Sequence, residues 1–158
     1  MKNLVRKLSV AVLCALVVCL SGCNKVKQIS VTSVDVESIA PVGFRGVNVY
    51  LAVGIDNPAF QIGLSEIEGS LKHSGKILGR LAMDPFVLQA KSAEIYHLKA
   101  LVTIDKEASL SELMALMDEK VLYECLLDIS VRVQLKSGVA KKIRLNDIPL
   151  KKLLDSLK

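Results

Sequence analysis

The stretch VNVYLAVGID, residues 47–56, decides the fold because its apolar and polar side chains alternate. A period of two places successive side chains on opposite faces of a β-strand. The apolar face carries Val47, Val49, Leu51, Val53 and Ile55. One apolar face and one mainly polar face are typical of an antiparallel strand that packs against a core on one side.

The same alternation recurs in residues 96–104 and 123–135, which predicts two more long strands. Shorter apolar stretches predict weaker strands at 29–36, 67–71, 77–81, 86–90 and 139–145. In the first of these the apolar parity changes near Thr32 and Ser33, which predicts a β-bulge. Ser-Gly pairs at 74–75 and 137–138 predict hairpin turns.

Two segments have a helical pattern. Residues 109–112, SLSE, form a capping box that predicts a helix through about Met117. Met114 and Met117 are expected to fill gaps in the core. After Pro149, which suits a first helical turn, leucines at 150, 153, 154 and 157 form the apolar stripe of a short amphipathic helix. Docking of this stripe on the domain is the main interpretation, and contact with a membrane surface is the alternative.

Apolar faces on about seven or eight antiparallel strands need an apolar surface to pack against, and two sheets packed face to face provide one. We therefore predict a mainly β fold, an antiparallel β-sandwich of the fibronectin-III or immunoglobulin type. One inserted helix and a short C-terminal helix complete it. Residues 29–158 are expected to form a single domain, because domains usually have about 100–200 residues.

The first 22 residues have a different composition from the rest of the chain. Residues 1–7 are basic, and residues 8–20 are an apolar run with the length of a signal-peptide core, too short to span a bilayer comfortably. The next residues, Leu20-Ser21-Gly22-Cys23, closely resemble the lipobox of bacterial lipoproteins. The resemblance implies a diacylglycerol on the Cys23 sulfur, cleavage before Cys23 and acylation of the new amino terminus. The alternative is an ordinary secretory signal with a chance cysteine at its end.

On this interpretation residues 1–22 are a cleaved leader and residues 23–28 are a lipidated tether. Stable anchoring requires two or more acyl chains, which the lipidated Cys23 would carry. Asn24 follows the cysteine, where an Asp would favour the inner membrane in enteric-type bacteria. We therefore expect the protein in the cell envelope, anchored in the outer membrane and facing the periplasm.

Charge and cysteine usage exclude several classes of protein. The net charge of the whole chain is +5, but the 136 residues after the leader contain 18 basic and 16 acidic groups, so a nucleic-acid partner is not expected. Cys14 and Cys19 lie within the leader, which leaves Cys125 without a partner for an internal disulfide. Cys125 also lacks the spacing of a metal site, so it is expected to be a small buried hydrophobe. No metal and no cofactor other than the acyl groups on Cys23 are expected.

The order of motifs resembles the type 2 late-embryogenesis-abundant domain, also called the water-stress and hypersensitive-response domain. The resemblance rests on the alternating strand that ends in Asn57-Pro58, on the stretch IEGSL at 67–71, on the turn at Gly75 and on ILG at 77–79. It covers residues 26–145 and implies a fibronectin-III-like sandwich with a helix inserted late in the chain. It also implies a non-catalytic role linked to stress protection and to envelope or membrane association. Asn57, Pro58 and Gly75 are then structural motif residues.

Candidate sites for chemistry are few. His73 and His97 are expected at the surface, because no pattern places either beside a nucleophile and a carboxylate. Lys141, Lys142 and Arg144 form a small basic patch that is a candidate for contact with anionic lipid headgroups, with plain solubility as the alternative. No catalytic residue is identified, and we do not expect an enzyme.

Three functions are weighed. The first is a non-catalytic, membrane-anchored lipoprotein that acts as an envelope interaction or stress-protective module, with an unidentified envelope protein or lipid as partner. The alternative is a carrier or chaperone of lipid or another apolar ligand in the periplasm, which requires a cavity. An enzyme of unfamiliar type is the third.

Overall fold

The computed structural model describes residues 2–20 and 29–155. The helices are α1 (Lys2–Leu20), α2 (Leu110–Ala115), α3 (Glu119–Glu124) and α4 (Leu150–Asp155). The strands are β1 (Ser30–Val42), β2 (Gly46–Asn57), β3 (Ile62–His73), β4 (Lys76–Met83), β5 (Phe86–Leu88), β6 (Ser92–Ile104), β7 (Leu126–Leu135) and β8 (Ala140–Pro149). No helix within the described residues is long and apolar enough to cross a membrane.

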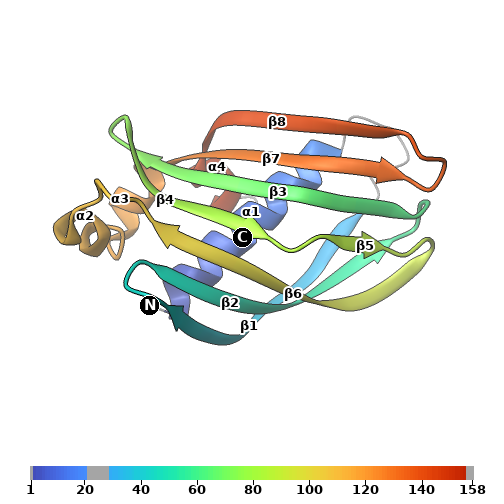
Figure 1. Cartoon of the computed structure of the whole chain (residues 1–158), viewed down its shortest axis with the longest axis horizontal. Coiled ribbons are helices and arrows are strands. Elements are labelled where there is room, and N and C mark those ends of the chain that lie inside the picture. Colours follow the sequence, from blue (N-terminus) through green and yellow to red (C-terminus); the bar gives the residue numbers. More distant parts are fainter. Residues whose placement is uncertain (1, 21–28, 156–158) are drawn as a thin grey trace.

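The strands pair in the order β1-β2-β6-β4-β3-β7-β8, and β5 pairs with β3 beside this path. Every strand pair is antiparallel. Strand β4 bonds to both β6 and β3, so hydrogen bonding continues from one half of the fold to the other. Helix α1 lies across one face of the strands (Figure 1). The predicted mainly antiparallel, β-sandwich-like fold with a few short helices is confirmed.

The buried residues of the strands are those that the alternating pattern predicts. Strand β2 buries Val49, Leu51, Val53 and Ile55, and β6 buries Leu98 and Ala100. Strand β7 buries Leu127, Ile129 and Val131. Because these side chains share one face of each strand, they form one apolar core together with buried residues of α1 and α4.

The predicted bulge and hairpins are present. The register of β1 against β2 shifts between Val31 and Ser33, so Thr32 is the extra residue of the bulge. The turn between β3 and β4 has φ of 50° at Ser74 and 78° at Gly75. Positive φ at both central residues is the geometry that matches the twist of a two-residue hairpin. The second hairpin joins β7 to β8, with φ of 93° at Gly138.

The insert between β6 and β7 contains two short helices, not one. The Ser109 capping box is confirmed, since the Ser109 side chain accepts from the Glu112 N–H and Glu112 accepts from the Ser109 N–H. Asp118 then caps a second helix, α3, by accepting from the Lys120 N–H. The strand predicted from residue 123 therefore begins at Leu126. Residues 123 and 125 continue the alternating pattern of the strand, which explains the early start of the prediction. Residues 123 and 124 instead belong to the capped helix α3.

The predicted burial of the α2 methionines is wrong. Leu110, Met114 and Met117 are 74%, 67% and 57% exposed. Helix α2 is only six residues long and lies at one end of the molecule (Figure 1), so only one side of it contacts the domain. Leu113 and Leu116 occupy that side. The others form an apolar surface in solvent, called the α2 patch below.

Helix α4 docks on the domain as predicted. Its leucines at 150, 153 and 154 are all buried. The backbone joins the helix to the sheet as well, because the Leu150 N–H donates to the Cys125 carbonyl at 3.0 Å. Leu157, the last leucine of the predicted stripe, lies outside the described residues.

Candidate functional site

The predicted lipidation site lies mostly outside the described residues. Leu20 ends α1, whereas Ser21, Gly22 and Cys23 belong to the segment 21–28. The chain is fixed to the domain from Ile29 onward, because that side chain is only 3% exposed. Six residue steps separate Ile29 from Cys23, and six extended residues span at most about 20 Å. An acyl anchor on Cys23 would therefore hold the domain close to a membrane surface.

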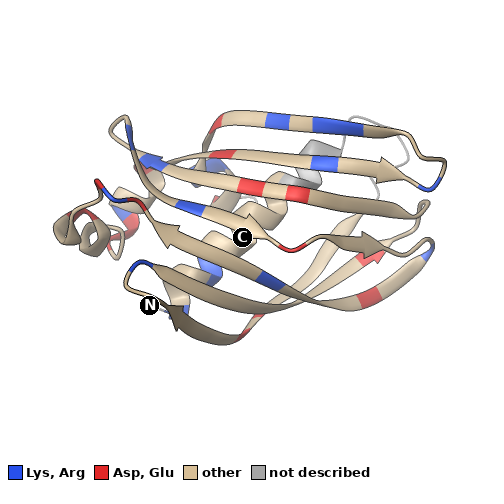
Figure 2. Ribbon diagram, in the orientation of Figure 1, with Lys and Arg blue, Asp and Glu red and all other residues tan. Residues whose placement is uncertain are grey.

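The structure divides the predicted basic patch between the two faces of β8. Lys142 pairs across from Arg132, and Arg144 pairs across from Ser130, so both point to the outer face. Lys141 pairs across from Val133, which shares the parity of the buried side of β7. Two of the three predicted residues therefore come together, and Lys141 does not join them. Figure 2 shows basic segments along β8 and an acidic segment of β3, with β7 between the two strands.

The acidic segment of β3 is placed by a second bulge, which sequence reasoning missed. The register of β3 against β7 shifts between Ser65 and Glu68, and Glu66 has φ of 47°. This geometry directs the Glu66 carboxylate toward Lys142, at 3.2 Å, and toward Arg132, at 3.9 Å. The charge of Lys142 is thus already paired within the chain.

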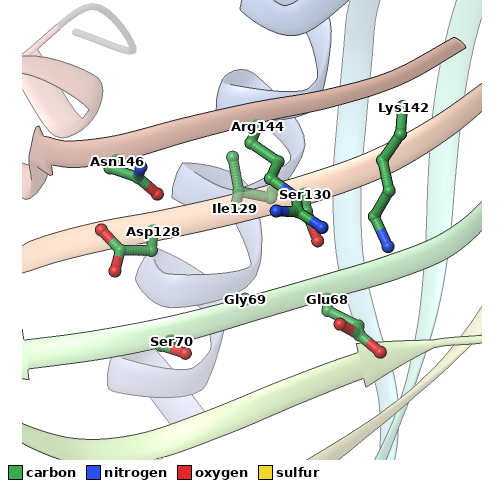
Figure 3. A pocket seen from close by; sticks show the side chains of 9 residues that line it. All are labelled: Glu68, Gly69, Ser70, Asp128, Ile129, Ser130, Lys142, Arg144 and Asn146. Carbon is green, nitrogen blue, oxygen red and sulfur yellow. The ribbon is translucent and has the colours of Figure 1, made fainter.

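Next to this ion pair is a hollow of about 220 Å³ on the outer face of the sheet, called the polar cleft below. Its lining comes from neighbouring strands β3, β7 and β8 (Figure 3) and consists of Glu68, Gly69, Ser70, Asp128, Ile129, Ser130, Lys142, Arg144 and Asn146. Figure 3 shows the Arg144 guanidinium beside Ser130, and Lys142 extending toward β3. Arg144 makes no ion pair with any described residue, in contrast to Lys142.

One end of the polar cleft is fixed by a charge cluster. Lys72 contacts Asp128 at 2.9 Å and Asp147 at 2.6 Å. Hydrogen bonds from Asp128 and Asp147 raise the pKa of Lys72. Burial raises the pKa of Asp128, but hydrogen bonds from Lys72 and from the Asp147 N–H outweigh it and bring the pKa below its ordinary value. Asp128 is therefore ionised at neutral pH and already paired with Lys72, so it helps to fix this end of the cleft.

The polar cleft can bind charged groups of both signs, since Arg144 and Glu68 line it together. No group of three metal-ligating side chains occurs in the described part of the chain. The arrangement fits weak binding of small polar groups at a surface.

The predicted motif residues hold loops together. Asn57 is completely buried, and its Nδ2 donates to the carbonyls of Phe60 and Gln89 at 3.0 and 2.9 Å. Its Oδ1 accepts from the Ala59 N–H at 3.0 Å. Pro58 follows directly and ends β2. This one side chain ties the loop after β2 to the loop after β5, which agrees with a structural role.

The two histidines lie at or near the surface, and the buried Cys125 is an unreactive thiol. His73 lies 3.4 Å from Glu124 and His97 lies 2.9 Å from Glu37, each beside one carboxylate. Cys125 is buried as predicted, and its Sγ donates to the Val121 carbonyl at 3.4 Å. Burial, with a smaller effect of the Glu124 charge, raises the pKa of Cys125 to about 11, which keeps it a neutral thiol.

A second hollow lies on the opposite face of the sheet, beneath α1, and sequence reasoning did not anticipate it. It has a volume of about 130 Å³ and is called the apolar cleft below. Leu8 and Val12 of α1 close it on one side. The domain contributes mainly the aliphatic side chains of Leu71, Leu78, Leu81, Val102, Leu113, Leu116, Leu127 and Leu150.

Comparison with known proteins gives only distant likeness. No family model matches the chain, and a search of curated proteins finds no match. Among solved structures, a protein from Archaeoglobus fulgidus aligns with 74% of this chain and 97% of its own, at 11% identity and a TM-score of 0.42. A β-glucuronidase from glycoside hydrolase family 2 aligns with 75% of this chain and 11% of its own, at 8% identity and a TM-score of 0.31. The archaellum periplasmic stator protein FlaG from Sulfolobus acidocaldarius aligns with 72% and 98%, at 9% identity and a TM-score of 0.26.

Proposed function

We propose that this protein is a non-catalytic lipoprotein of the cell envelope, anchored through acyl chains on Cys23 in the outer membrane and facing the periplasm. The observation that supports this most directly is the spacing between the lipobox and the folded domain. The domain is fixed from Ile29, six steps after Cys23. A tether this short keeps Ile29, where the domain begins, within about 20 Å of the membrane surface. The domain then acts by contact, as an interaction or stress-protective module related to the type 2 late-embryogenesis-abundant domains.

The α2 patch supports an interaction role. Its three side chains are more than half exposed; Leu110 and Met114 belong to α2, and Met117 lies in the turn that follows it. Strand β1 starts next to the tether and runs for 13 residues toward the turn at Arg45, which bonds to Ile104 at the end of β6 before α2. Thirteen strand residues span about 40 Å, so the patch is remote from the anchor. An exposed apolar surface that faces the periplasm fits a protein partner with an apolar surface of its own.

The anchor is tested by removing its acceptor. We expect Cys23→Ala, with residues 1–22 exchanged for a leader that is cut without lipid attachment, to move the protein from the membrane fraction to the soluble periplasmic fraction. Cys125→Ala is the matched control, because Cys125 is buried in the domain and carries no lipid in this proposal. Partition of the Cys23→Ala protein into membranes at the wild-type level would contradict lipid anchoring.

The contact role is tested in a deletion strain under osmotic, drying and detergent stress. Wild-type protein is expected to restore survival, whereas a double variant of the α2 patch, Leu110→Ser with Met114→Gln, is expected to fail although it is anchored and folded. Because both side chains are exposed, the double variant should keep the stability of the wild type, and thermal unfolding of the purified variant checks this. Full survival of the deletion strain itself would contradict the proposal.

A second function, carriage of lipid or another apolar ligand, is favoured by the apolar cleft. The cleft beneath α1 is smaller than the few hundred Å³ that ligand sites usually have. However, α1 is the segment that the lipobox assigns to the cleaved leader. Its departure would enlarge the cleft by the volume of the α1 side chains that now pack there.

A further inference from the structure

The charges of the polar cleft follow the register of three neighbouring strands. On the outer face, Arg144 of β8 pairs across from Ser130 of β7, and Ser130 pairs across from Glu68 of β3. These three residues are called the open row below. Neighbouring strands lie about 4.8 Å apart, so the Cα atoms of Arg144 and Glu68 are roughly 10 Å apart. Figure 3 shows the Arg144 guanidinium beside Ser130, on the side of Glu68. The open row thus presents a cation and an anion on either side of a serine hydroxyl.

Ion pairs close the outer face on both sides of the open row. On one side, Lys142 of β8 reaches over β7 to Glu66 of β3, at 3.2 Å. On the other side, Lys72 of β3 contacts Asp128 of β7 at 2.9 Å. The two charged side chains of the open row are exposed and make no ion pair with any described residue. The hollow lies where these opposite charges stay apart.

The balance of charge around the polar cleft decides the kind of ligand. The open row and the ion pairs beside it contain equal numbers of basic and acidic side chains, namely Lys72, Arg132, Lys142 and Arg144 against Glu66, Glu68, Asp128 and Asp147. A simple anion or a simple cation gains little here, because each meets a like charge across the open row. A molecule that carries both charges can pair with both sides at once.

We propose that the polar cleft binds a small zwitterion in which an acid group and a primary ammonium group are a few bonds apart. Arg144 and the Ser130 hydroxyl donate to the carboxylate or phosphate, which a guanidinium binds through two parallel N–H groups. Glu68 accepts from the ammonium. The volume of about 220 Å³ is below that of sites for drug-sized ligands and suits so small a molecule. The site lies on the face opposite α1, so it goes beyond the proposed envelope function and does not depend on the lipid anchor.

Titration of the isotope-labelled full chain, followed by nuclear magnetic resonance, tests the proposal. The chain is kept unprocessed by Cys23→Ala and made without export, which retains every described element. The zwitterionic probes are O-phosphoethanolamine and β-alanine, and the probes with a single kind of charge are inorganic phosphate and ethylamine. The backbone amides of Gly69 and Ser130 line the cleft and report binding. The amide of Gly138, in the turn between β7 and β8, reports nonspecific effects of the added solute.

We expect O-phosphoethanolamine to shift the two cleft amides to saturation, with an affinity roughly tenfold or more above that of phosphate or ethylamine. Arg144→Gln should lower this affinity by roughly tenfold or more, since a charged hydrogen bond contributes about that factor. Lys141→Gln removes the same charge from the other face of β8 and is the matched control, with no change expected.

Glu68→Gln gives a second, independent signature. It should weaken binding of O-phosphoethanolamine, because the ammonium loses its acceptor. It should strengthen binding of phosphate, because a like charge leaves the cleft. Opposite effects of one variant on two probes cannot come from a loss of folded protein, so this signature separates binding from stability.

Equal affinity for O-phosphoethanolamine and phosphate would indicate a simple anion site and would overturn the proposal. Absence of saturable shifts at Gly69 and Ser130, or equal shifts at Gly138, would overturn it as well. Bicelles that contain phosphatidylethanolamine distinguish two sources of the same chemistry: if they shift the cleft amides, the ligand is a lipid headgroup, and if only the free probes do so, it is a free solute. Both of these results support the zwitterion site. Lipid anchoring is tested separately by membrane fractionation, so the two proposals can fail independently.

Discussion

At the scale of single residues, glycines show how closely the strands approach each other. A Cβ at Gly54 would lie 2.5 Å from both Thr32 Oγ1 and Ser33 Oγ, the residues of the β1 bulge. A Cβ at Gly69 would meet its nearest atom, the Asp128 carbonyl oxygen, at 3.4 Å. A side chain at position 54 would therefore displace two hydroxyls of the bulge, whereas one methyl group at position 69 would make only ordinary contacts.

We predict that Gly54→Ala lowers the free energy of unfolding by about 1–3 kcal/mol, the usual cost of overpacking. Gly69→Ala is the matched control and should change it by less than about 1 kcal/mol. Urea unfolding of both variants, followed by circular dichroism, measures the difference. Equal stability of the two would mean that the β1 bulge is not placed as described.

A second residue-scale prediction concerns acid. Hydrogen bonds from the Ser109 N–H and side chain, together with Lys76 at 3.2 Å, lower the pKa of Glu112 from 4.5 to about 2. A lowered pKa in the folded state means that the stabilisation is present above pH 4.5 and is lost as the pH falls toward 2. Glu112→Gln should therefore lower stability at pH 7 and have little effect at pH 2. Thermal unfolding at both pH values checks this, and an equal effect at the two pH values would contradict it.

At the scale of elements, the sequence predicted the strands and turns whose structure depends on their own residues. Period-two patterns predicted the strands around Leu51 and Val131, and Ser-Gly pairs predicted both hairpins, since turn geometry depends on the turn residues themselves. The Ser109 capping box predicted the start of α2. The sequence did not predict the second helix, α3, and it placed the exposed Met114 and Met117 in the core, because the domain decides which side of a short helix is covered. The side of β8 taken by Lys142 and Arg144 follows from alternation, but Glu66, the partner of Lys142, is placed by a bulge that leaves no clear pattern in the sequence.

Burial of α4 allows a matched prediction. Leu150 is completely buried and Leu110 is 74% exposed, although both begin short helices with the same residue type. Leu150→Ala should lower the free energy of unfolding by about 2–5 kcal/mol, since it leaves a cavity next to the apolar cleft. Leu110→Ala should change it by no more than about 0.5 kcal/mol. Chemical denaturation of the processed protein measures both, and a small effect of Leu150→Ala would mean that α4 is only loosely docked.

At the scale of the whole molecule, α1 and the rest of the chain form one core. Neither the charge pattern of residues 1–7 nor the apolar run of residues 8–20 predicted this, because both also describe a helix destined for the export machinery. The contact arises because the aliphatic side of α1 packs into the apolar cleft, where Leu8 and Val12 lie. Processing would then act on stability as well as on location.

This gives a prediction that separates the two forms of the protein. Val12 is 4% exposed in the contact with the domain, and Val12→Asp would bury an unpaired charge there. In the unprocessed chain, kept intact by Cys23→Ala and made without export, Val12→Asp should lower the unfolding midpoint by several degrees. Asn3→Asp, at an exposed position of the same helix, is the matched control. After processing, both variants yield the same chain and the same midpoint. If Val12→Asp left the unprocessed chain as stable as the control, α1 would not be part of the core.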